Sequence, residues 1–226
     1  MVAASAIIDR ARLQAIDAGK MRWQDEELLL WLSDGQRTVV AMAPSASAKT
    51  DIVPLVGGTR QTLPDGAYML LSILRNVDPA TDEPGRAVRV SSREVLDTTD
   101  PDWHLHCKSQ AVRNYVYDPA EPLNFYVWPP NTGGGKVQLV YARDPPELTA
   151  VDNEIIVQPI YQTALVDYLL YRMHSKDSDF AAGLQLATNF LQSFMGFMQS
   201  GETTQLAANP NLQLGMVDPS MKATAK

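Results

Sequence analysis

The segment from Arg113 to Pro146 constrains the fold most, because it holds the strongest β-strand signal in the chain. Three runs rich in β-branched and aromatic residues are separated there by Asp-Pro, Pro-Pro and Gly-Gly-Gly turns. These runs are Asn114–Tyr117, Phe125–Trp128 and Lys136–Tyr141. Val137, Leu139 and Tyr141 share one face of the last run, as in a sheet with one packed face. The segment therefore predicts three neighbouring antiparallel strands.

Amphipathic patterns on both sides of this segment predict four helices. The predicted helices are Ala3–Ala18, Trp23–Ala43, Pro159–His174 and one that begins at a cap on Asp177 or Ser178 and ends at Gly201. The apolar stripe expected to bury the last helix consists of Leu184, Ala187, Leu191, Phe194, Met195 and Met198. Phe197 lies off this stripe, which suggests a contact between helices of different subunits.

Short apolar runs alternate with turn signals between the second helix and the central segment. The predicted strands are Ile52–Gly58, Tyr68–Val77 and Arg86–Val90. The second of these has a continuous apolar pattern that leaves a helix open, and the preceding Pro-Asp-Gly turn favours a strand. Thr59–Gly66 is predicted to be turn-rich, and Ser91–Cys107 to be a loop with one helical turn.

The order of these elements predicts an α+β protein. Helices from both ends of the chain are expected to form a four-helix bundle, with an antiparallel β lobe inserted between them. An irregular C-terminal arm is expected to follow. The expected domains are 1–47 and 151–200 for the bundle, 48–150 for the β lobe and 201–226 for the arm.

The charge and cysteine content exclude several classes of protein. With a net charge of -7, the chain lacks the basic stripe of a protein that grips nucleic acid through its phosphates. The single cysteine, Cys107, excludes an internal disulfide framework. Asp9, Arg10 and Arg12 interrupt the apolar core that a signal peptide needs, and no run is long enough to span a membrane. We expect a soluble protein made in a cytoplasm.

One cluster has the residue types of a metal centre. It consists of Asp97, Asp100, Asp102, His104, His106 and Cys107. In an extended segment His104 and His106 would point to the same side, as two ligands require, and the set would suit a metal-dependent hydrolase. However, the only other histidine is His174, and no second ligand group is present. The sequence favours a turn-rich loop anchored by Trp103, with no catalytic, cofactor-binding or metal-binding residue.

Two other features favour packing over chemistry. Gly133–Gly135 precedes Lys136 as in a phosphate-binding loop, but a strand follows instead of a helix, so we expect a flexible hairpin tip that contacts a neighbouring chain. The aromatic residues of the central segment lack a basic groove for stacking bases, which favours a core or subunit interface. They are Tyr115, Tyr117, Phe125, Tyr126 and Trp128.

Several short motifs, in order along the chain, carry a resemblance. They are Gly57–Gly66 (GGTRQTLPDG), Arg93–Asp97 (REVLD), Pro101–His104 (PDWH), Tyr115–Asp118 (YVYD), Phe125–Pro130 (FYVWPP), Val140–Tyr141 with Pro145–Pro146, and Tyr161–Asp177. With them the chain resembles the head-to-tail adaptor proteins, also called tail tubular or connector proteins, of short-tailed bacteriophages. The resemblance covers the second to the fourth predicted helix, and leaves out the first helix and the residues after Gly201.

The resemblance implies a structural virion protein with a helical bundle and an inserted β lobe, and no catalytic residues. It implies a homo-oligomeric ring, usually of twelve subunits, that joins the portal protein to the tail nozzle or tail tube and extends the DNA channel. Genomic DNA would pass through without specific binding, so acidic residues such as Glu83, Asp118 or Glu121 are expected to line the bore. The arm after Gly201 is expected to become ordered against the portal. The alternative is another neck or tail-completion protein that binds a fibre or tail component.

Overall fold

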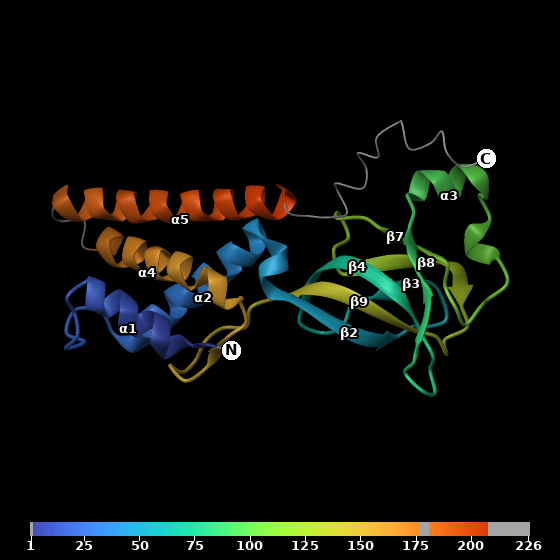
Figure 1. Cartoon of the computed structure of the whole chain (residues 1–226), viewed down its shortest axis with the longest axis horizontal. Helices are drawn as coiled ribbons and strands as arrows, with labels where there is room; N and C mark the ends of the chain where they lie inside the picture. The colour runs from blue at the N-terminus through green and yellow to red at the C-terminus, as the bar shows by residue number, and fades with distance from the viewer. Residues whose placement is uncertain (1, 177–180, 208–226) are drawn as a thin grey trace, which may run out of the picture.

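The computed structural model describes residues 2–176 and 181–207, and it shows a mixed α+β protein (Figure 1). Helices gather at one end of the elongated molecule and two β-sheets at the other. A short pair of strands, β1 (Val2–Ala3) and β10 (Glu154–Ile155), belongs to the helical end. The predicted caps Asp177 and Ser178, and the predicted arm from residue 208 onward, lie outside the described residues.

The helical part is organised around α4 (Gln162–Lys176), which packs against all three other long helices. These are α1 (Ala4–Gln14), α2 (Asp25–Met42) and α5 (Ala181–Ala207). The short helix η3 (Pro159–Tyr161) leads into α4, with Pro159 at its first position as predicted. Leu28 and Leu32 of α2 and Leu165 and Leu169 of α4 are fully buried in a common core. The contacts through α4 support the predicted bundle in part.

The β part consists of two four-stranded sheets that share a second core. One sheet has the strand order β2-β9-β4-β5, formed by β2 (Ala48–Pro54), β9 (Lys136–Arg143), β4 (Ala67–Val77) and β5 (Pro84–Ala87). The other has the order β3-β8-β7-β6, formed by β3 (Gly58–Thr62), β8 (Asn124–Asn131), β7 (Asn114–Tyr117) and β6 (Arg89–Val90). Val137, Leu139 and Tyr141 are buried in this core, as their alternation predicted.

The prediction of one three-stranded meander is only half right. β7 and β8 are antiparallel neighbours, but β8 and β9 belong to different sheets and do not pair. The reason is that the apolar faces of both strands cover the same core from opposite sides: Phe125 and Val127 from β8, and Val137 and Leu139 from β9. The glycine-rich connection therefore crosses from one sheet to the other.

Other predicted boundaries and elements need correction. The segment predicted to be turn-rich contains the strand β3, because it pairs with β8. The run from Arg86 to Val90 divides into β5, which pairs with β4, and β6, which lies parallel to β7 in the other sheet. The predicted loop at 91–107 contains α3 (Arg93–Thr99), capped by the Ser92 hydroxyl, and the short helix η2 (Trp103–Leu105).

Two helix ends also differ from the prediction. α1 ends at Gln14, before Ala18, because the Asp17 carboxylate accepts hydrogen bonds from the Met21 and Arg22 amides and folds the following residues into a loop. α5 continues past Gly201 to Ala207, since Gly201 lacks the positive φ of a helix-ending glycine. The predicted stripe of α5 is partly wrong as well, because Leu184 and Met195 are exposed.

Two segments connect the helical part to the β part. They are η1 (Pro44–Ser47) and the residues that follow β9. Arg143, at the end of β9, donates hydrogen bonds to the Ser47 carbonyl (3.4 Å) and the Ile156 carbonyl (3.1 Å). The Ser47 hydroxyl donates to the Arg143 carbonyl at 2.9 Å. The Arg143 side chain thus forms hydrogen bonds with both segments that connect the two parts.

Candidate functional site

The side chains of the cluster that has the residue types of a metal centre bind other parts of the chain instead of converging on one point. The Trp103 indole donates a hydrogen bond to Asp97 (2.8 Å), and His106 Nε2 lies 2.8 Å from Asp100. His104 belongs to η2 instead of an extended segment, and its Nδ1 lies 2.9 Å from the Thr59 hydroxyl. Within the described residues, no group of three or more His, Cys, Asp or Glu side chains is placed to hold a metal ion.

These contacts place η2 against the outer face of the sheet β3-β8-β7-β6, with α3 linked to it through the bond between Asp97 and Trp103. Trp103 is almost fully buried, stacks on His104 with ring centroids 3.6 Å apart, and meets the edge of Tyr126 on β8. A recess of about 200 Å³ remains between Trp103, His104, Tyr126, Val116 and Arg93. Among the described residues that line this recess, none is a serine or a carboxylate, so it lacks a paired nucleophile and base.

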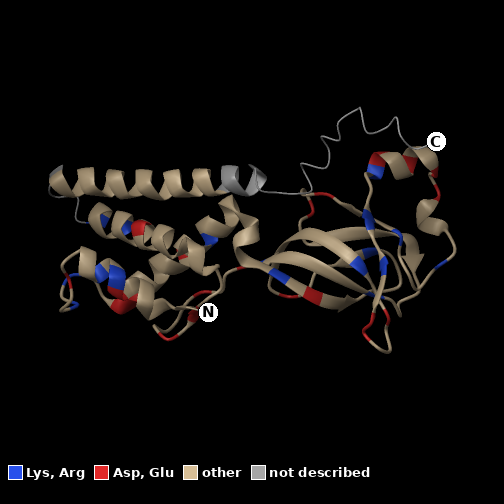
Figure 2. Ribbon diagram, viewed as in Figure 1, with Lys and Arg blue, Asp and Glu red and all other residues tan. Residues whose placement is uncertain are grey.

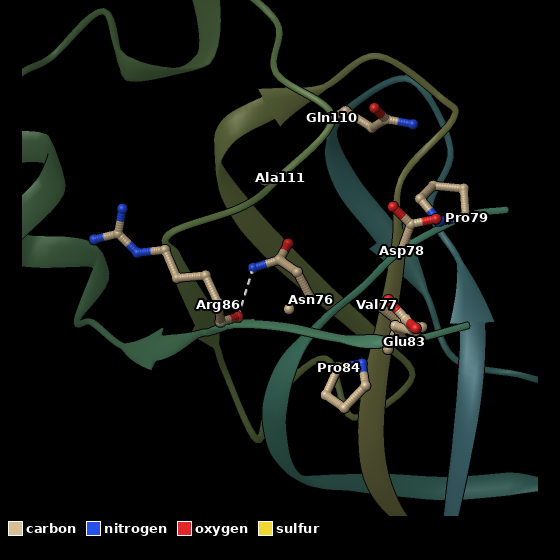
Figure 3. Close-up of a pocket in the computed structure, with 10 residues that line it drawn as sticks. Asn76, Val77, Asp78, Pro79, Glu83, Pro84, Arg86, Gln110 and Ala111 are labelled. Atoms are coloured by element: carbon tan, nitrogen blue, oxygen red, sulfur yellow. Dashed lines mark hydrogen bonds between the residues drawn. The ribbon is translucent and has the colours of Figure 1, made fainter. Parts of the chain in front are cut away.

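A larger recess of about 330 Å³ lies beside the β4–β5 turn (Figure 3). The Asn76 side chain is used structurally there: it donates to the Arg86 and Val112 carbonyls and accepts from the Val112 amide. Asp78 accepts hydrogen bonds from the backbone of Ala80 and Thr81, which lower its pKa. In Figure 3 the Arg86 side chain points away from the acidic side chains. The charged groups therefore do not converge on a ligand position.

The glycine-rich connection is held tightly, contrary to the predicted flexible hairpin tip. The Asn131 side chain is fully buried and accepts hydrogen bonds from the amides of Gly133 (2.8 Å) and Gly135 (3.2 Å). Its amide group donates to the carbonyls of Ser109 and Gln110. A Cβ atom on Gly135 would collide with the Gln110 carbonyl oxygen and with Asn131. This connection is a fixed crossover between sheets.

The aromatic residues of the central segment serve packing within the chain. Phe125 is fully buried and Tyr115 nearly so, both in the core between the sheets. Tyr126 and Trp128 lie on the other face of β8, against Trp103 and the Arg113 guanidinium respectively. Phe197 is half-buried and its ring meets Tyr161 at 6.1 Å, so its contact also lies within the chain.

The loop between α1 and α2 contains a buried ion network that sequence reasoning missed. Arg12 contacts Asp17 at 2.8 Å and Asp25 at 2.7 Å, and it donates to the Trp23 carbonyl. Lys20 also pairs with Asp25. The signal in the sequence is an arginine next to the apolar stripe of a helix, with a carboxylate five residues later.

The network sets the ionisation of its two carboxylates. Burial raises the pKa of Asp17, but the backbone amides of Arg22, Met21 and Trp23, together with the Arg12 charge, outweigh burial and hold the pKa below its usual value. The hydrogen bond from Lys20, with that from Arg12, lowers the pKa of Asp25 in spite of burial. Both groups are therefore charged partners of Arg12 at neutral pH.

The acidic residues expected near a DNA channel are exposed, but they lie on different connections. Glu83 belongs to the β4–β5 turn of one sheet, and Asp118 and Glu121 to the β7–β8 turn of the other. Figure 2 shows that charged residues are distributed over the β part and over α1 and α2. In contrast, the part of α5 whose side chains are described is tan throughout, so it contains no Asp, Glu, Lys or Arg.

With the geometry in view, comparison with known proteins decides the family. A model of the SU10 adaptor protein family matches residues 2–213, which is nearly the whole chain. The chain belongs to the SU10 adaptor protein family. This confirms the resemblance to phage head-to-tail adaptors and extends it over the first helix. A search of curated proteins found no match.

Membership of the SU10 adaptor family makes the protein a phage adaptor, a structural component that binds other parts of the virion. The family implies a role that is not enzymatic. Within the part of the chain that is described, no helix combines the length and apolar character needed to cross a membrane. The functional surfaces of an adaptor are accordingly its contacts with neighbouring proteins.

Proposed function

We propose that this adaptor forms a homo-oligomeric ring in the neck of the virion, joins the portal protein to the tail nozzle or tail tube, and extends the DNA channel. The proposal includes twelve subunits and assembly in the host cytoplasm. It rests on the match to the SU10 adaptor family over residues 2–213. The role uses no catalytic residue, metal or cofactor.

The division of the molecule into two parts supports a protein that bridges two neighbours. Each part has its own buried core, and the chain passes between them near residues 48 and 150. We propose that the helical part (1–47 and 151–200) and the β part (48–150) act as separate domains, one for each neighbouring component. Two rigid units joined by a fixed connection can hold portal and tail at a set distance.

We further propose that exposed carboxylates face the bore. A wall of negative charge repels the duplex and keeps it from binding during ejection. Glu83, Asp118 and Glu121 are the candidates, and all three are exposed. Glu83→Lys, Asp118→Lys and Glu121→Lys tested singly should slow DNA release from assembled particles when the residue faces the bore, and a map of the ring with a basic bore would contradict the proposal.

The residues after Ala207 are proposed to bind the portal. Truncation after Ala207 keeps the whole of α5 and removes only residues 208–226. We expect the truncated chain to fold, as checked by circular dichroism, and to lose affinity for portal rings. Unchanged attachment would count against this contact.

The direct test of the proposed function is binding to the portal. Purified chain and portal rings from the same phage are mixed, and the complex is followed by sedimentation and electron microscopy. We expect a ring of adaptor copies on one end of the portal. Binding to a fibre or tail component without binding to the portal would instead support the alternative neck or tail-completion role.

A further inference from the structure

We propose that the exposed face of α5 is the surface by which one copy of this chain binds the next copy in the adaptor ring. The inference rests on the proposed function, which supplies the ring, and it adds the surface that builds it. It concerns the residues from Ala182 to Gly201, and we call their side chains that point away from α4 the α5 face.

One side of α5 packs against the rest of the helical part. Ala187, Phe194 and Met198 are buried against the helical core. Three ring contacts follow α5 along α4 and η3: His174 with Phe190 at 5.7 Å, Tyr168 with Phe194 at 5.5 Å, and Tyr161 with Phe197 at 6.1 Å. The Ser193 hydroxyl also donates to Asp167 of α4. The orientation of α5 is thereby fixed, and its other side is presented to the surroundings.

The chemistry of that other side is unusual for a helix in water. From Ala181 to Gly201 the sequence contains no Asp, Glu, Lys, Arg or His, although 20% of the whole chain is charged. Leu184 and Met195, which are 58% and 37% exposed, border this side along one edge, and Leu186, which is 43% exposed, borders it along the other. Uncharged polar residues such as Gln185 and Gln192 lie between the two edges. Solvated helix faces normally carry charges, whereas the centre of a protein interface is depleted of them. The α5 face shares with the centre of an interface its lack of charged residues.

The size of the face suits a subunit contact. The 20 residues from Ala182 to Gly201 span about 30 Å at a rise of about 1.5 Å per residue. Half the circumference of a helix about 10 Å wide then gives an area on the order of 500 Å² per partner, which reaches the roughly 1,000 Å² in total that a biological interface needs. Depletion of charge is strongest in permanent homo-oligomers, so a second copy fits this face better than a transient partner.

The geometry of a ring indicates which side of the next copy receives α5. A ring uses one head-to-tail contact repeatedly, so each copy must present two different faces on opposite sides. In Figure 1, α4 lies between α5 on one side and α1 and α2 on the other, and α4 contacts all three. The receiving side is therefore the α1–α2 side, where Leu13 and Leu30 are 75% and 52% exposed.

A charge placed on the α5 face tests the proposal through assembly. Gln192→Lys combined with Met195→Lys puts two charges on exposed positions, so folding should be retained, as checked by circular dichroism and thermal unfolding. We expect at least a tenfold loss of adaptor copies bound per portal ring by mass photometry. The matched control is Leu105→Lys, an 82% exposed position in the β part, which should assemble like the unmodified chain.

A cross-linking experiment locates the contact independently of stability. A photoreactive amino acid replaces Gln192, and an equal mixture of ¹⁴N- and ¹⁵N-labelled chain is assembled on portal rings, irradiated and digested. We expect mixed-isotope cross-links from α5 to residues of α1 or α2. Cross-links to the portal, to another α5 or to the β part would overturn the inference.

The two proposals fail in different ways. Rings that form normally from the Gln192→Lys, Met195→Lys chain would overturn the role of the α5 face and leave the adaptor function intact. An unmodified chain that neither binds portal rings nor self-associates would overturn the proposed function, and the inference with it.

Discussion

At the scale of single residues, Arg12 has a large expected effect on stability. Its side chain is only 3% exposed and faces two carboxylates, of which Asp17 is equally buried. The network holds the α1–α2 loop, in which Ile16 adopts a positive φ of 55° and is 92% exposed. A β-branched residue in this conformation is strained, so the loop depends on the contacts around it.

Replacing Arg12 removes the partner of a buried charge. For Arg12→Ala we expect a loss of about 3–5 kcal/mol in the free energy of unfolding, because Asp17 would be left buried without its counter-charge. Urea unfolding followed by circular dichroism measures this loss. The matched control is Arg37→Ala, whose exposed pair with Asp34 at 3.7 Å should contribute less than about 1 kcal/mol. Equal losses in both variants would contradict the importance of the network.

The lowered pKa of Asp17 predicts a pH dependence of stability. A carboxyl whose pKa is lower in the folded protein stabilises it fully above the unfolded pKa, near about 3.9, and this contribution is lost as the pH falls through the folded value. Asp17→Asn should therefore be less stable than the unmodified chain at pH 7, and the difference should shrink below pH ~4. Urea midpoints at several pH values test this, and a constant difference would disprove the assignment.

At the scale of elements, the fixed crossover between β8 and β9 decides how the two sheets are joined. Gly135 lies where no side chain fits, whereas a Cβ atom on the neighbouring Gly134 would make only ordinary contacts, the nearest at 3.8 Å. For Gly135→Ala we expect a loss of about 1–3 kcal/mol, because the backbone must shift to relieve the collision. Gly134→Ala is the control in the same loop and should change the urea midpoint little.

The sequence predicted an element well where its periodic pattern placed the apolar residues on one buried face. β7, β4 and β9 have nearly the predicted bounds, and α2 shows the amphipathic pattern from which it was predicted, since Leu28, Leu32 and Val39 are buried on one side. The sequence could not predict which strands pair. Alternation in β8 and β9 identifies the buried face of each strand, but it does not identify the side of the core on which each strand lies.

The candidate site shows the same limit. The histidine and aspartate cluster was interpreted as an incomplete ligand set, and its placement around α3 and η2 follows from the contacts of Trp103 with Tyr126 and Asp97, which are tertiary. The Arg12 network was missed because five residues separate Arg12 from Asp17 and the loop that brings them together has no turn motif. The exposed, uncharged side of α5 emerged only when α4 showed which side was covered.

At the scale of the whole molecule, the joint between the two parts determines what an adaptor can bridge. The Arg143 side chain forms hydrogen bonds with both connecting segments. The Gln158 backbone amide also donates a hydrogen bond to the Ala46 carbonyl at 2.9 Å. Because the two cores are separate, the angle between the parts depends on these few contacts. A fixed angle is what a component that connects portal and tail requires.

For Arg143→Ala we expect both parts to stay folded while their relative orientation becomes variable. Small-angle X-ray scattering should then show a wider distribution of interatomic distances, and amide exchange should rise near residues 44–48 and 156–158. Arg89→Ala, an exposed arginine of β6, serves as the control and should leave both measurements unchanged. An unaltered scattering profile for Arg143→Ala would show that other contacts fix the joint.

The central claim, that this SU10-family adaptor builds the passage between portal and tail, is tested most directly by imaging the neck of the intact virion by cryo-electron microscopy. The account predicts a ring of this chain directly below the portal, with α5 of each copy against α1 and α2 of the next and an open channel through its centre. Density for this chain as a single copy, or placed on a fibre away from the channel, would contradict it.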